Sequence, residues 1–351
     1  MSERHVHHYL GLAHRLGPEL GDHRYLSARA QLEAESDNFR AALAWALPEE
    51  LPSSEREGRT SIGLSLCAAL GPFWQAFGYL DAEGRGWLER AVKHGSGSDS
   101  SELAQCLRHL SLFVSNAQEL DRAREYASAS VTMSRRFNDS NSLAESLVAL
   151  GMLESERGDT LAARAAYQEA LTIATSSGGQ AQRHLALQGL AFLEQQEQHY
   201  DVAHEMLTKL LAISHELGDP YSVVLDQHNL AYSLRLTGRV EEAHQLIHSI
   251  IPTALTFNVP AHLMNLAQEY AAILIELGHH KTATRLLSAA DVVHELSQTP
   301  RTPPSQAEYQ DCIAKTQAAL TPQEWNNAYA SGKNTALTDA LARAHAAHVP
   351  A

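Results

Sequence analysis

The chain has 351 residues, a length that predicts either two domains or an array of repeats, because a single compact core rarely grows so large. Hydrophobic residues make up 44% of the chain and charged residues 19%, as in globular proteins, and no apolar run approaches the roughly 18 residues of a membrane-spanning helix. The formal net charge of −14 argues against a phosphate-binding surface, so we expect no direct nucleic-acid partner and no membrane partner.

The first 60 residues are expected to form an N-terminal helical segment. Within them, residues 33–47, EAESDNFRAALAWAL, have the apolar spacing of an amphipathic helix. Residues 51–61 and 94–102 are rich in Ser, Gly and charged side chains, which is typical of exposed loops.

A period of 40 residues follows and defines the second predicted domain, residues 61–298. One position of the period is always small and follows a large apolar residue, an alanine recurs twelve residues later, and an apolar residue recurs sixteen residues later. The small residues are Gly71, Ser111, Gly151, Ala191, Ala231 and Ala271, and the alanines are Ala123, Ala163, Ala203, Ala243 and Ala283. Such self-similarity predicts repeated units of supersecondary structure.

Each period has the pattern of a helix, a turn and a second helix. Glycine lies seven residues after the small position in four of the six units, at Gly78, Gly158, Gly238 and Gly278, where a left-handed residue can end the first helix. The recurring alanine allows the two helices to approach closely. The pattern resembles the tetratricopeptide repeat, lengthened from about 34 residues to 40. We therefore predict an all-α, right-handed superhelix of about six helix-turn-helix units.

Residues 299–351 are expected to close the array as a C-terminal helical cap. The segment 296–309 contains three prolines, which interrupt the repeat pattern. Ser305 with Glu308, and Thr321 with Glu324, have the spacing of capping boxes, so each pair should begin a helix.

The resemblance to tetratricopeptide repeats implies that the first helices of the units line a concave groove. Aromatic rings there would supply apolar contact area, amides could bind a peptide backbone, and arginine could hold a carboxylate in a bidentate pair. The predicted ligand-binding residues are Arg108, Asn116, Gln188, Phe192, Gln195, His228, Tyr232, Arg235, Asn265 and Gln268. The alternative is a solvated helical face that binds nothing.

No motif in the sequence predicts catalysis. The 20 histidines lack the HExxH spacing of a zinc site, no G-x-S-x-G nucleophile motif occurs, and we expect no metal and no cofactor. Acidic pairs such as Glu154 with Glu156 have the pattern of a solvated helix face. Three cysteines without a C-x-x-C pair, and an N-terminus unlike a secretory signal, predict reduced thiols in a cytoplasmic protein.

Two segments resemble a more specific family than the repeat alone. They are LEAESDNFRAALAWAL with GPFWQAFGYLDAEGRGWLERAV (71–92), and residues 283–344 from ATRLLSAADVVHEL to TALTDALARA. Together they resemble the C-terminal repeat region of actinobacterial STAND-type NTPase transcriptional regulators, the LuxR-like and AfsR-like ATPases, over nearly the whole chain. In that family a P-loop NTPase and a winged helix precede the repeats. No G-x-x-x-x-G-K-[ST] occurs in this chain, so we expect it to bind no nucleotide through a P-loop.

The sequence thus predicts a non-enzymatic binding module, the sensor part of a transcriptional regulator. Its ligand would be a peptide, a protein segment or a small effector, and its regulatory partners would be the NTPase and winged-helix domains, in cis or in trans. The alternative function is a structural scaffold for oligomerisation, for example as a homodimer, without a groove ligand.

Overall fold

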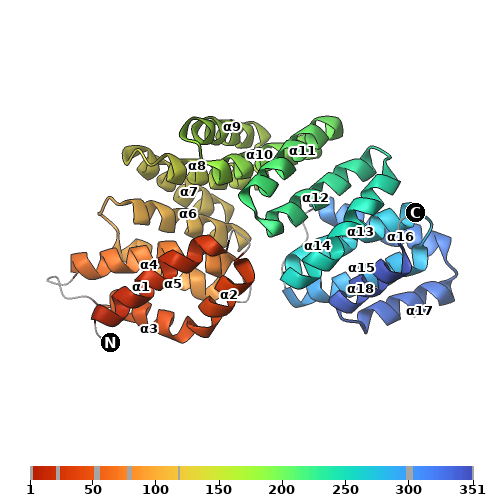
Figure 1. Cartoon of the computed structure of the whole chain (residues 1–351), viewed down its shortest axis with the longest axis horizontal. Helices are drawn as coiled ribbons and strands as arrows, with labels where there is room; N and C mark the ends of the chain where they lie inside the picture. The colour runs from red at the N-terminus through yellow and green to blue at the C-terminus, as the bar shows by residue number, and fades with distance from the viewer. Residues whose placement is uncertain are drawn as a thin grey trace. The chain divides into compact units, whose positions relative to one another are not determined.

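The computed structural model describes residues 3–20, 24–50, 56–76, 81–117, 119–297 and 303–349. Within these ranges it contains eighteen α-helices and no strand, which confirms the predicted all-α class (Figure 1). The helices are α1 Glu3–Glu19, α2 Tyr25–Ala34, α3 Ser36–Ala46, α4 Arg56–Ala76, α5 Asp81–His94, α6 Ser101–Asn116, α7 Leu120–Arg136, α8 Ser140–Glu156, α9 Thr160–Ser177, α10 Gln180–Gln196, α11 Tyr200–Leu217, α12 Pro220–Leu236, α13 Val240–Phe257, α14 Pro260–Glu276, α15 His280–Ser297, α16 Pro303–Ala319, α17 Pro322–Lys333 and α18 Leu337–Ala347. No helix of the described ranges is both long and apolar enough to cross a membrane.

The chain divides into two compact units, each of which is described by itself. Unit 1 comprises Met1–Glu197 with Ala212–Pro220, and unit 2 comprises Gln198–Leu211 with Tyr221–Ala351. This division differs from the expected boundaries after residues 60 and 298, which stay a prediction.

The 40-residue period is confirmed in the helix bounds. From α7 to α15 every helix begins 20 residues after the one before it, so one period holds two helices. Residues in the turns have positive φ at the same spacing: Asn138 (51°), Gly158 (81°), Gly178 (77°), Gln198 (63°), Gly218 (63°), Gly238 (79°), Asn258 (50°) and Gly278 (83°). The left-handed turn therefore occurs after both helices of a repeat, and the predicted Gly78 lies outside the described residues.

The recurring residues build the contact between the two helices of a repeat. A Cβ added to Gly151 of α8 would lie 2.7 Å from the ring of Tyr167 on α9, which is the apolar residue sixteen positions later. Tyr167 itself is only 2% exposed, so its ring has little room to move. The five recurring alanines from Ala123 to Ala283 are all fully buried. Small residues recur because the neighbouring helix already fills the space of a larger side chain.

The predicted helix over residues 33–47 is wrong in one respect, because Glu35 divides it into α2 and α3. Glu35 has φ −99° and ψ 7°. Its carboxylate accepts hydrogen bonds from two side chains. The hydroxyl of Tyr9 donates to Glu35 Oε2 over 3.1 Å, and Asn38 Nδ2 donates to the same oxygen over 2.7 Å. The break thus joins α1 to α3. Of the first predicted loop, residues 51–61, the part 51–55 lies outside the described residues, and 56–61 belong to α4. The second predicted loop, residues 94–102, ends at Ser100, which caps α6.

One of the two predicted capping boxes forms. Thr321 Oγ1 accepts from the backbone N–H of Glu324, whose carboxylate accepts from the backbone N–H of Thr321, and α17 begins at the next residue, Pro322. The box of Ser305 with Glu308 is wrong, because α16 already begins at Pro303 and places Ser305 inside the helix. Glu308 is instead bound by Arg235 of α12.

Candidate binding face on the first helices

We call the surface of the first helices of the repeats, α6, α8 and α10 of unit 1 and α12 and α14 of unit 2, the first-helix face, and it includes the ten predicted ligand-binding residues. In unit 1, polar contacts join successive first helices on this face. Arg108 Nη2 of α6 lies 3.0 Å from Glu145 Oε2 of α8, and Gln182 Nε2 of α10 donates to Glu145 Oε1 over 2.9 Å. Ser115 of α6 donates a hydrogen bond to the Glu156 carboxylate of α8. Arg108 is therefore engaged within the array, and its side chain is only 15% exposed.

Apolar side chains are open to solvent on the unit 1 face. Met152 of α8 and Phe192 of α10 occupy the same position of successive repeats, 40 residues apart, and are 44% and 49% exposed. Leu185, two turns before Phe192 on α10, is 39% exposed. Single exposed apolar residues are common, but these three lie on neighbouring first helices, and two of them recur at one position of the repeat, so together they offer apolar surface that a partner can bury.

The remaining predicted residues of unit 1 are amides on the same helices. Asn116 ends α6 and is exposed, whereas Gln188 and Gln195 of α10 are half-buried. Each amide group offers both a donor and an acceptor, the combination that a peptide backbone requires.

In unit 2, Arg235 already pairs with carboxylates of its own chain, and its role as a receptor for a ligand carboxylate stays a prediction. Its side chain is only 7% exposed and already forms a bidentate pair with Glu269 of α14, Nε to Oε1 at 2.8 Å and Nη2 to Oε2 at 3.0 Å. Glu276 of α14 and Glu308 of α16 also contact the guanidinium. Burial alone would lower the pKa of Arg235, but Glu269 and Glu308 outweigh it and raise the pKa above its ordinary value. We call these four residues the Arg235 cluster.

The other predicted residues of unit 2 are mostly shielded. Tyr232 is half-buried beneath Arg235, whose guanidinium carbon lies 5.4 Å from the ring centroid. Burial lowers the pKa of His228 to about 4, so this imidazole is neutral at physiological pH, and its ring lies 5.6 Å from that of His262. Asn265 is exposed, while Gln268 is half-buried and its Nε2 finds no hydrogen-bond partner among the described residues.

Ion pairs between glutamates of the first helices and arginines of the neighbouring helices were not predicted from the sequence. Glu154 was expected on a solvated face, but its side chain is only 5% exposed and pairs with Arg124 of α7 over 2.6 Å. The same pair recurs one period later, where Arg164 Nη1 of α9 lies 2.5 Å from Glu194 Oε1 of α10. An arginine and a glutamate that both recur after 40 residues were a signal in the sequence that these carboxylates are structural.

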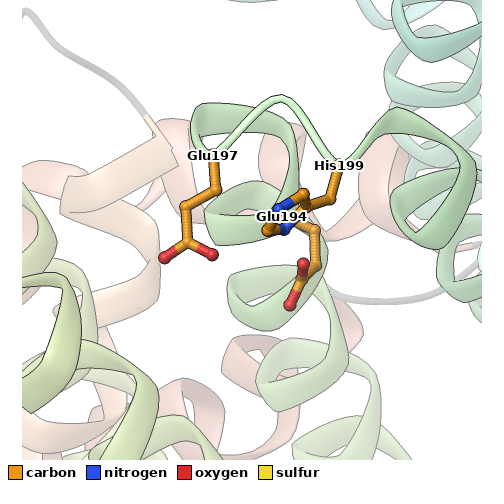
Figure 2. Close-up of side chains that lie close together, drawn as sticks. All are labelled: Glu194, Glu197 and His199. Carbon is orange, nitrogen blue, oxygen red and sulfur yellow. The ribbon is translucent and has the colours of Figure 1, made fainter.

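Three side chains with metal-ligating groups lie at the end of α10 and in the turn after it. Ligand atoms of Glu194, Glu197 and His199 lie within 4.8 Å of one another (Figure 2). Arg164 pairs with both carboxylates, and its Nη2 lies 2.7 Å from Glu197 Oε2. Because Arg164 already pairs with both carboxylates, we assign no metal to this turn.

Comparison with solved structures identifies the same architecture elsewhere. The chain is similar to a Rap protein complexed with Competence and Sporulation Factor, at 12% identity over 98% of this chain and 100% of that one, with a TM-score of 0.61. It is similar to the Rap conjugation gene regulator of plasmid pLS20 in complex with the Phr* peptide, at 13% identity over 91% and 97% of the two chains, with a TM-score of 0.54. A STAND protein with a tetratricopeptide repeat sensor from Pyrococcus horikoshii matches at 16% identity and a TM-score of 0.52, over 92% of this chain and 46% of that one.

The sequence itself has no such match. No family model matches the chain, and neither does any curated protein. At identities below one fifth, the solved structures establish the fold and nothing finer. The chain is therefore a helical repeat protein of the tetratricopeptide type.

Proposed function

We propose that the chain is a non-enzymatic module that binds a peptide, a protein segment or a small effector on its first-helix face. The observation that carries the proposal is the exposure of Met152 and Phe192 at one position of successive repeats. A thioether and an aromatic ring each offer large apolar area, and a partner that covers them gains the free energy of removing that area from water. The amides of Gln188 and Gln195 on α10 can form hydrogen bonds with the backbone of a bound peptide.

The comparisons support a peptide or protein as the partner. The Rap conjugation gene regulator is described in complex with a peptide, and the Rap protein in complex with Competence and Sporulation Factor. A peptide or protein partner for this chain is our inference, because the identities to these two proteins are 12% and 13%.

We further propose that the binding event regulates a transcriptional regulator of the STAND type. The supporting observation is the similarity to the STAND protein, which is described as having a tetratricopeptide repeat sensor. This chain spans less than half of that protein, so an NTPase and a winged helix acting in cis or in trans belong to the proposal. A cytoplasmic location fits the three free, buried cysteines.

The test is selection of binders from a phage-displayed library of random peptides on the purified chain, followed by calorimetry. Phe192→Ala and Met152→Ala should each weaken the selected peptides by about tenfold or more, which corresponds to ~1.4 kcal/mol. Leu161→Ala is the matched control, because Leu161 is an 82% exposed apolar residue on the second helix α9. Selected peptides that bind both variants as well as the unchanged chain would show that the site lies elsewhere.

The alternative of an oligomerisation scaffold has its own measurement. Light scattering over a hundredfold range of concentration would give a constant monomer mass for a pure binding module. A dimer that Phe192→Ala or Met152→Ala dissociates would instead assign the exposed apolar residues to a contact between two copies.

A further inference from the structure

Five histidines gather where the last helix docks on unit 2. The helix α18 packs on α13, α14 and α15. The histidines are His244 and His248 of α13, His279 immediately before α15, His345 of α18 and His348 directly after it. The rings of His248 and His345 are stacked with centroids 3.9 Å apart, those of His279 and His348 are 4.2 Å apart, and those of His244 and His248 are 6.2 Å apart.

The same histidines provide hydrogen bonds that hold the end of α18. His248 Nε2 lies 3.1 Å from the carbonyl oxygen of His345, and His348 Nε2 lies 3.0 Å from Thr282 Oγ1. The hydroxyl of Tyr270 donates to the carbonyl oxygen of Ala344 over 3.5 Å. Two of these three contacts therefore depend on an imidazole.

The charged groups near this junction give the histidines no anionic partner. The electrostatic effects on three of these histidines come from other histidines. His248 and His279 act on His244, His248 acts on His345, and His279 and His244 act on His348. Lys281 at the start of α15 adds positive charge and pairs with Glu324, while Asp339 and Arg343 of α18 form no ion pair with a described residue. Glu241 is exposed in the first turn of α13. The other carboxylates facing these helices are engaged elsewhere, Glu242 with Arg239, Glu269 and Glu276 with Arg235, Asp291 with Tyr329 and Glu295 with Lys333.

We propose that α18 is an acid-released cap, docked while the five histidines are neutral and undocked when they are protonated. Neutral imidazoles can stack as the structure has them, whereas imidazolium ions at these distances repel one another. Undocking would expose the apolar residues that α18 buries, Leu337, Leu341 and Ala344 among them, and the surface of α13 and α15 against which they pack. No three of these histidines bring their ligand nitrogens within 4.8 Å of one another, so the geometry points to charge rather than to a bound metal.

The direction of the pH dependence follows from the pKa shifts. Burial, and then the neighbouring histidines, lower the pKa values of His244, His345 and His348 below the ordinary value. The undocked helix then binds protons more readily than the docked one, so docking is strongest above pH ~6.5 and weakens as the pH falls below it. From pH 7.5 to 5.5 each histidine contributes at most about a tenfold change in the docking equilibrium, and three contribute on the order of 10³.

Hydrogen exchange of the full chain at pH 7.5 and pH 5.5, corrected for intrinsic exchange rates, tests this cap. We expect the protection factors of α18 amides to fall by more than tenfold and by at most about one thousandfold, while amides of α14 keep theirs. A change of less than tenfold in α18 would overturn the proposal. A simultaneous loss of protection throughout α13, α14 and α15 would also overturn it, because that result describes acid unfolding of the whole unit.

Variants attribute the effect to the cluster. His345→Gln with His348→Gln should reduce the pH-dependent change in the protection of α18 to at most about tenfold, the contribution left to His244, whereas His7→Gln, an exposed histidine bonded to its own helix α1, should change nothing. If the double variant fails to dock at pH 7.5, His279→Gln removes the imidazole ring next to His348 without removing a described hydrogen bond of α18. His279→Gln should reduce the pH-dependent change in protection, and a change as large as in the parent chain would count against the cluster.

Discussion

The Arg235 cluster allows a quantitative test of whether this arginine is a structural or a ligand-binding residue. The perturbation is Arg235→Met, which keeps most of the apolar stem and removes the guanidinium. The Glu269 side chain, only 5% exposed, would then keep its charge without the bidentate partner that compensates it. A buried carboxylate that loses its cation is the dominant cost of such a substitution.

The magnitude is set by Glu269. Removing one partner of a buried ion pair costs about 3–5 kcal/mol, because the other charge is left uncompensated. Glu276 and Glu308 are 35% and 41% exposed, so solvent screens their contacts and they add at most about 1 kcal/mol between them. We therefore expect Arg235→Met to lower the free energy of unfolding by roughly 3–5 kcal/mol. The double variant Arg235→Met with Glu269→Leu should recover most of this loss, because neither charge is then left buried.

The assay is urea unfolding followed by circular dichroism, with hydrogen exchange of α12 and α14 as the local readout, since a repeat array can unfold in parts. Arg239→Met is the matched control, because Arg239 pairs with Glu242 in the same chemistry while the two side chains are 45% and 54% exposed. It should leave the unfolding midpoint unchanged. The prediction is refuted if Arg235→Met lowers the free energy of unfolding by less than about 1 kcal/mol. It is also refuted if the double variant Arg235→Met with Glu269→Leu is less stable than Arg235→Met alone.

Five further substitutions, at four positions, test the turns, the helix contacts and a helix cap by thermal unfolding. Gln198→Gly should stabilise the chain by about 1 kcal/mol, because Gln198 is held at φ 63° where glycine has no steric penalty, and an unchanged melting temperature would contradict this. Gly189→Ala should lower the free energy of unfolding by about 1–3 kcal/mol, because the added Cβ would lie 2.3 Å from the buried ring of Tyr167. Gly11→Ala should raise it by about 0.5–1 kcal/mol, because a Cβ at Gly11 would have no other atom within 4 Å. Thr321→Ala should cost about 1 kcal/mol by removing one half of a capping box, and Thr321→Ser should retain most of it.

The fold could be predicted from the sequence because the residues that build it recur. Gly151 and Tyr167 contact each other inside one repeat, so their spacing along the chain records the contact. The 40-residue period of the sequence is therefore also the period of the helices, because from α7 to α15 a helix begins every 20 residues. The break at Glu35 could not be predicted, because it depends on the hydroxyl of Tyr9, 26 residues away in a helix outside the period.

The site was predictable only as a set of positions. The repeat indicates which residues lie on the first helices, but it does not indicate what they touch in the next unit. Arg235 illustrates the difference: its contacts with Glu269 and Glu308 span 34 and 73 residues and depend on how successive helices stack. Side chains with the composition of a ligand site therefore proved to be partners of one another.

The position that directly follows the small residue of each repeat differs in exposure between the two units. In unit 1 it holds Pro72 and Leu112, which are half-buried, and Met152 and Phe192, which are nearly half exposed. In unit 2 it holds Tyr232, half-buried beneath Arg235, and Ala272, which is 5% exposed. A ligand carboxylate at Arg235 would first have to displace Glu269 and leave that charge buried, a cost that one new ion pair does not offset. No comparable cost opposes a partner that covers Met152 and Phe192, because those side chains are already in water. Recognition is therefore expected in unit 1, while the same positions of unit 2 serve the stability of the array.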